Sequence, residues 1–180
     1  MQWLVNRIID GNVSKYVGFL FAAALLVFSV FLPFFEILAE NADIPARPAF
    51  SKTQITIKPM AQKPFVLNVE VAQSDFQHQY GLMFSSALAP MTGMLFVFDA
   101  AKTRHFWMKN TPIPLDILFF DSDGMLVSVA QNAPPNSQAI IQSAGPARYV
   151  LEIAAGEAAR LGVEKGTRLV LPVLSSTLRY

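Results

Sequence analysis

The sequence predicts a mainly β protein, an antiparallel sandwich or jelly-roll-like barrel with two short helices, preceded by an apolar membrane segment at its N-terminus. Three observations predict this class. Apolar and polar residues alternate with a period of two after residue 53, which is the spacing of a half-buried strand. Turn signals rich in Pro, Gly, Asp and Ser separate the alternating runs. Helix start and stop signals occur in only two short segments.

The apolar segment comprises residues 16–35 and contains no charged residue, and Arg7 and Lys15 precede it. At about 1.5 Å per residue it is long enough for the roughly 30 Å hydrocarbon core of a bilayer. Two interpretations stay open for residues 1–39: a signal peptide cleaved after Ala39, or an uncleaved N-terminal membrane anchor. Both predict an extracytoplasmic domain, in the periplasm or at the outer face of the inner membrane, with the membrane as a partner through residues 16–35.

The next segment, residues 40–52, contains two prolines and is typical of a linker, which leaves residues 53–180 as one exported β domain. The chain holds 14 Lys and Arg against 13 Asp and Glu, a net charge of +1 that gives no reason to expect nucleic acid as a partner. It has no cysteine, which excludes disulfides, thiol catalysis and thiolate metal sites.

The alternating runs predict the strands, and the capping residues predict the helices. Ser74 and Gly81 delimit one short helix, and Glu157 and Gly162 delimit the other. DSDG at 121–124 is typical of a hairpin turn. The predicted strands are residues 53–58, 65–72, 94–98, 105–109, 115–120, 125–131, about 138–143, 148–154 and 167–174.

The run HFWMKNTPIPLDILFFD, residues 105–121, predicts a rigid hairpin. Its two prolines hold the TPIP link in an extended conformation. If the flanking strands pair across this link, Lys109 lies opposite Asp116, with Cβ atoms about 4.5 to 5.5 Å apart. We therefore expect an ion pair between Lys109 and Asp116, with Asn110 bracing the turn.

Several motifs occur in a specific order: GLMF (81–84), GMLFVF (93–98), FWMKNT (106–111), PLDILFFD (114–121), LEIAAG (151–156) and a closing G-x-x-L-V. Over roughly residues 64–174 the chain resembles the bacterial and archaeal family known only as domain of unknown function 192. The resemblance implies a mainly β, jelly-roll-like domain, often exported, and no established activity. The family commonly has arginine after GLMF, where this chain has Ser85, which puts any anion-binding role at that position in doubt.

The leading functional hypothesis is a non-enzymatic module that binds a small molecule, glycan or peptide in the cell envelope. An aromatic platform with a few polar groups suits sugars or peptides, and Trp107 has polar neighbours. Asp116 lies in a wholly apolar strand, where a carboxylate is partnered, solvent-facing or costly. The candidate ligand-binding residues are Trp107, Lys109, Asn110, Asp116, Glu152 and Glu70.

The alternative hypothesis is a hydrolase built on the strand carboxylates Asp116, Glu152 and Glu70, because paired carboxylates cleave glycosidic bonds. The sequence lacks G-x-S-x-G, H-E-x-x-H, the P-loop and G-x-G-x-x-G, so it favours a protein that is not an enzyme and predicts no catalytic residue. Thioether and imidazole side chains could together bind Cu(I), and the candidates for such a soft-metal set are Met83, Met94, Met108 and His105. Methionine also fills irregular cores, so neither a metal site nor a cofactor is predicted.

Overall fold

The protein is described by a computed structural model, which covers residues 45–172. The predicted apolar segment, residues 16–35, lies outside the described residues, so the choice between signal peptide and anchor stays a prediction. Among residues 45–172, none of the helices has the length and apolar character needed to span a membrane.

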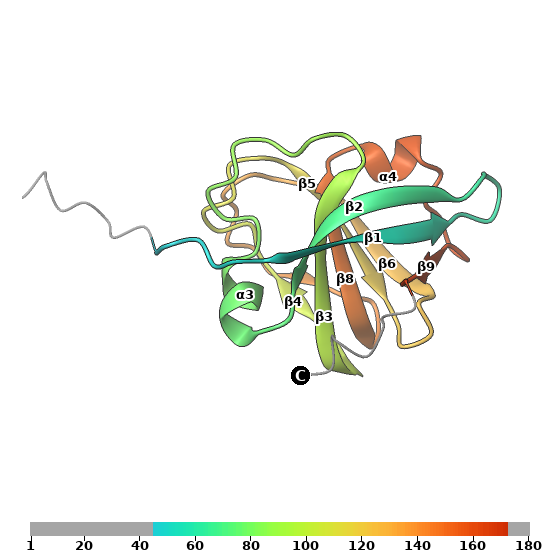
Figure 1. Ribbon diagram of the computed structural model, residues 1–180, viewed down its shortest axis with the longest axis horizontal. Coiled ribbons are helices and arrows are strands. Elements are labelled where there is room, and N and C mark those ends of the chain that lie inside the picture. Colours follow the sequence, from blue (N-terminus) through green and yellow to red (C-terminus); the bar gives the residue numbers. More distant parts are fainter. Residues whose placement is uncertain (1–44, 173–180) are drawn as a thin grey trace, which may run out of the picture. The chain divides into compact units, whose positions relative to one another are not determined.

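The described chain is mainly β with two short helices, as the alternation predicts (Figure 1). The elements in chain order are β1 (Ser51–Lys58), β2 (Phe65–Ala72), α3 (Asp75–Tyr80), β3 (Thr92–Lys102), β4 (His105–Phe106), β5 (Leu115–Phe120), β6 (Leu126–Ala133), β7 (Ile141–Gln142), β8 (Ala147–Ala154), α4 (Glu157–Arg160) and β9 (Arg168–Val170).

Seven of these strands form one sheet in the order β6-β5-β8-β3-β2-β1-β9, and β4 and β7 form a separate two-stranded ribbon. The large sheet curls until its two edges meet. Met125, just before β6, forms an isolated bridge with Arg168 of β9, and the Leu169 N–H donates to the Gly124 carbonyl at 2.8 Å. The fold is a curled half-barrel whose two edges touch at this isolated bridge. Of the two predicted alternatives, a sandwich of stacked sheets and a barrel, it is nearer to the barrel.

The pairing of β2 with β3 is parallel, with Asn68 beside Thr92 and Ala72 beside Phe96. The chain runs from β2 to β3 through α3 and a loop, a crossover long enough to bring the second strand back in the same direction. The other pairings of the large sheet are antiparallel, as predicted, and this pair is the exception, because strand periodicity carries no information on direction.

Both faces of the sheet are apolar near its centre. One cluster contains Leu118 and Leu151, while the other contains Ile117, Phe119 and Val150. Phe106 of the small ribbon covers the second face, packing edge-on against Phe119 with ring centroids 5.8 Å apart. Burial on both faces explains why β5 is apolar at nearly every position. Met94 and Met108, two members of the considered soft-metal set, are buried in the second cluster.

The predicted hairpin is wrong, since β4 and β5 belong to different sheets. Asn110 adopts φ 55°, which turns the chain away after β4, and β5 pairs with β6 and β8 as an inner strand of the large sheet. Lys109 is exposed whereas Asp116 is fully buried, so the expected ion pair does not form. The two prolines of the link remove backbone donors that hairpin pairing would require.

Candidate functional site

The Asp116 carboxylate is held by hydrogen bonds within the fold. It accepts hydrogen bonds from the backbone N–H groups of Asn132 and Ala158, both at 2.9 Å, and thereby links β6 and the start of α4 to β5. The residue is 0% exposed. Both of its oxygens are therefore engaged by backbone donors, one buried at Ala158 and one partly buried at Asn132, and Asp116 does not line either hollow described below.

Trp107, Lys109 and Glu152 come together around one cavity of about 30 Å³, called here the Glu152 cavity. Glu152 comes from β8, and the other two lie in the segment after β4. The further lining residues used below are Tyr80, Phe96, Phe106 and Thr111. Trp107 is 44% exposed, and the Lys109 ammonium lies 5.4 Å from the centroid of its ring, so this pair faces solvent.

The carboxyl group of Glu152 is buried, with the residue 4% exposed. Within residues 45–172 it takes part in no ion pair, since the two ion pairs there involve Glu70 and Glu157. Burial disfavours the charged form and raises the pKa of Glu152 to about 8. At neutral pH the Glu152 side chain is therefore mainly a protonated carboxylic acid.

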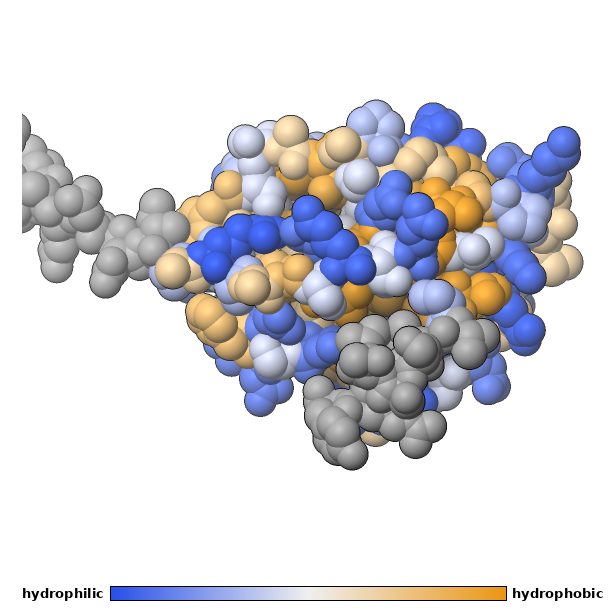
Figure 2. Space-filling view, viewed as in Figure 1, coloured by the Kyte–Doolittle hydropathy of each residue, from blue (hydrophilic) through white to orange (hydrophobic). Residues whose placement is uncertain are grey.

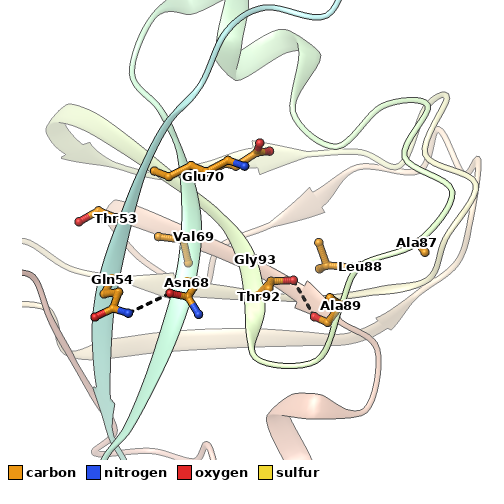
Figure 3. A pocket seen from close by; sticks show the side chains of 11 residues that line it. Thr53, Gln54, Asn68, Val69, Glu70, Ala87, Leu88, Ala89, Thr92 and Gly93 are labelled. Atoms are coloured by element: carbon orange, nitrogen blue, oxygen red, sulfur yellow. Dashed lines mark hydrogen bonds between the residues drawn. The ribbon is translucent and has the colours of Figure 1, made fainter.

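A second and larger hollow, called here the polar groove, has a volume of about 520 Å³ (Figure 3). Its floor is the outer face of β1 and β2, and residues 87–89 form the opposite wall. The Gln54 side-chain amide donates to the Asn68 side-chain carbonyl at 3.0 Å, and the Thr92 hydroxyl donates to the Ala89 carbonyl at 2.6 Å. Figure 2 shows hydrophilic residues gathered over β1 and β2 on this face.

Glu70 lines the polar groove rather than the Glu152 cavity. Its carboxylate forms an ion pair with the Arg47 guanidinium, and Arg47 Nη1 lies 3.4 Å from Glu70 Oε1. Glu70 is therefore held at one end of the groove by a neutralising partner.

The three strand carboxylates do not form a paired site. Ile117 pairs with Glu152 and Asp116 pairs with Ile153, which places Asp116 and Glu152 on opposite faces of the sheet. Glu70 and Glu152 share a face, but the fully buried Met94 lies between them in the same cross-strand row. The geometry gives the hydrolase hypothesis no pair of carboxylates around a common space.

Asn110 joins two of the signature motifs. Its carbonyl accepts a hydrogen bond from the Phe84 N–H at 2.7 Å, and its side-chain nitrogen lies 4.0 Å from the Met83 sulfur. FWMKNT is thereby tied to GLMF, and both motifs contribute walls to the Glu152 cavity. Asn110 thus lies at a turn with Met83 and Phe84 as its neighbours, but this turn is not the tip of the predicted hairpin.

Several site residues were not singled out from the sequence. Gln54 and Asn68 occupy outward positions of their strands, a signal present in the alternation, but nothing local indicates that residues 87–89 close the groove. Tyr80 and Phe106 look like ordinary core residues in the sequence. Their place around Glu152 follows from the crossover between β2 and β3 and from the β4-β7 ribbon.

Comparisons with known proteins agree with this fold. The family model for DUF192, described as Uncharacterized ACR, matches residues 56–171. A crystal structure from Sinorhizobium meliloti 1021, described as a "putative transcription regulator", is 42% identical, with a TM-score of 0.66 over 68% of this chain and 95% of that one. A protein of unknown function from Novosphingobium aromaticivorans DSM 12444 is 33% identical, with a TM-score of 0.65 over 74% of this chain and 99% of that one. No curated protein matches.

Proposed function

The chain belongs to the DUF192 family, and we propose that it is a non-enzymatic binding module of the cell envelope that holds a glycan in the polar groove. The observation that carries this proposal is a hollow of ligand size in which the side-chain amides of Gln54 and Asn68 lie on paired strands. The charged residues Lys52 and Glu70 also line it. A volume of about 520 Å³ lies within the range of roughly 300 to 1,000 Å³ that small-molecule sites occupy.

The lining of the groove matches the chemistry of a sugar. Gln54 and Asn68 carry amides, which both donate and accept hydrogen bonds as sugar hydroxyls do. Figure 3 shows these two side chains next to each other on β1 and β2, and Leu88 on the loop across the groove. Leu88 offers an apolar surface for the C–H face of a ring. Strands hold the amides at fixed positions, which lowers the entropic cost of binding.

A glycan fits this groove better than an extended peptide does. Peptides that add to a sheet need a strand edge with free backbone groups. β1 and β2 pair with each other from Ser51 with Val71 to Ile57 with Phe65, so the floor of the groove offers side chains rather than an edge.

We expect the purified full-length chain to show a thermal shift with short neutral or N-acetylated oligosaccharides from the cell envelope. Replacing both groove amides, Gln54→Ala with Asn68→Ala, removes hydrogen bonds worth about 1 kcal/mol each, which weakens binding roughly thirtyfold. Isothermal titration calorimetry measures this change. Gln131→Ala, which removes an exposed amide on β6, is the matched control and keeps wild-type affinity. Wild-type affinity in the double variant, or a response to peptides alone, contradicts the proposal.

The cell-envelope part of the proposal rests on the apolar residues 16–35 and on the resemblance, which implies a domain that is often exported. A reporter that is active only after export, fused after residue 60, is expected to be active in cells. Mass measurement of the native protein then separates the two N-terminal alternatives, because loss of residues 1–39 indicates a signal peptide. Reporter signal confined to the cytoplasm contradicts export.

A further inference from the structure

Glu152 differs from the other buried carboxylates in the part of the chain that the structure describes. Asp116 accepts two backbone N–H groups, and Glu157 pairs with Arg160 through Oε1 at 2.7 Å, although Glu157 Oε2 has no hydrogen-bond partner. The Glu152 carboxyl has no ion-pair partner there and borders a cavity. A buried carboxyl without a partner costs several kcal/mol when it ionises, so a complementary group on a ligand gains unusually much from reaching it.

The size of the Glu152 cavity limits what can enter. A cavity needs roughly 10 to 15 Å³ of this kind of volume to hold one water molecule. At about 30 Å³, the cavity accepts a group of that size, such as a primary ammonium, and excludes a sugar ring. The polar groove and the Glu152 cavity therefore select different ligands.

The walls of the cavity favour a cation. Tyr80, Phe96, Phe106 and Trp107 are among the residues that line it, and aromatic side chains attract ammonium groups. Hard metal ions instead require several oxygen ligands. Residues 45–172 contain no group of three His, Cys, Asp or Glu side chains placed to hold a metal ion. An organic ammonium fits this lining better than a metal ion does.

Lys109 supplies a second contact in the wall of the cavity. It is exposed, its ammonium lies beside the Trp107 ring, and neither of the ion pairs within residues 45–172 involves it. Lys109 is therefore available to an anionic group. One hollow thus offers a buried carboxyl and an accessible ammonium, which is the complement of a zwitterion.

We propose that the Glu152 cavity binds a small zwitterionic ligand of the amino-acid class, with the ligand's ammonium at Glu152 and its anionic group at Lys109. When the ammonium enters, the Glu152 carboxyl releases its proton to solvent and the resulting carboxylate pairs with the cation. The other titratable residues that line the cavity are His78 and Tyr80 of α3 and Lys109, and Glu70 lies beyond Met94 on β2. This site is independent of the polar groove, so failure of either proposal leaves the other standing.

The test titrates glycine and methylammonium into the full-length chain by isothermal titration calorimetry. Two buffers of different ionisation enthalpy reveal whether a proton is released on binding. We expect release of up to one proton at pH 6.5 and an affinity that rises about tenfold per pH unit from pH 5.5 to 7.5. Absence of binding by both probes, binding without proton release, or equal binding of methanol overturns the proposal.

Three variants assign the contacts. Glu152→Gln keeps the shape of the side chain and is expected to weaken both probes at least tenfold and to abolish proton release. Lys109→Met is expected to weaken glycine severalfold and to leave methylammonium unchanged. Glu70→Gln, which alters a carboxylate of the groove, is the control and changes neither probe. Unchanged glycine binding in Glu152→Gln contradicts the contact with the ligand's ammonium. Unchanged glycine binding in Lys109→Met contradicts the contact with its anionic group. Proton release by the wild-type chain tests the role of Glu152 without any variant.

Discussion

The wild-type chain is expected to lose about 4 kcal/mol of unfolding free energy between pH 5 and pH 8, and Glu152→Gln is expected not to show this loss. Burial raises the pKa of Glu152 from 4.5 to about 8. In that pH window the unfolded chain has released this proton while the folded chain still holds it, so stability falls as pH rises, by about 1.4 kcal/mol per pH unit. The loss is complete above pH 8 and absent below pH 4.5.

Urea unfolding of both proteins at pH 5, 6, 7 and 8 measures this effect. The free energy of unfolding of Glu152→Gln is expected to depend less steeply on pH than that of the wild type. Glu70→Gln is the control, because Glu70 is partly exposed and paired with Arg47, and it should keep the wild-type slope. Parallel curves for wild type and Glu152→Gln would show that the Glu152 carboxyl ionises normally in the folded chain.

Asp116→Ala is expected to lower the free energy of unfolding by about 2 to 4 kcal/mol, because it leaves the buried Ala158 N–H and the partly buried Asn132 N–H without their acceptor. Asp116→Asn keeps one oxygen acceptor but brings an NH₂ group against a donor, so it should lose less. Denaturant unfolding at constant pH measures both.

The control for Asp116 is Asp99→Ala, since Asp99 is an exposed carboxylate of β3. It should change stability by less than about 0.5 kcal/mol. A similarly small loss for Asp116→Ala would mean that water replaces the carboxylate at both donors, and that Asp116 does not anchor α4 to β5.

The elements with a strong local signal were predictable from the sequence. β2, β5 and β8 follow their alternation or apolar runs, and Ser74 marks the start of α3 through a capping box with Gln77. The order of the strands, the parallel pairing of β2 with β3 and the curling of the sheet were not predictable. They depend on which apolar surfaces meet in three dimensions, and a period of two is the same for every partner and direction.

The candidate site was also predictable only in part, because the sequence shows unusual residues but not their partners in three dimensions. Trp107, Lys109 and Glu152 were chosen as polar or aromatic residues among apolar ones, and the fold brings them to one cavity. Asp116 was chosen by the same rule, but its two backbone donors come from β6 and the start of α4, far along the chain. A charged residue in an apolar strand signals a partner without revealing which one.

The central proposal, glycan binding in the polar groove, is tested most directly by following side-chain amide signals in the NMR spectrum of the full-length chain as an oligosaccharide is added. The proposal predicts that the side-chain NH₂ resonances of Gln54 and Asn68 shift with saturation, because both amides line the groove, whereas those of Gln131 and Gln142 stay in place. Unmoved Gln54 and Asn68 signals while resonances elsewhere shift would contradict the proposed site, and an unchanged spectrum with every envelope oligosaccharide would contradict glycan binding itself.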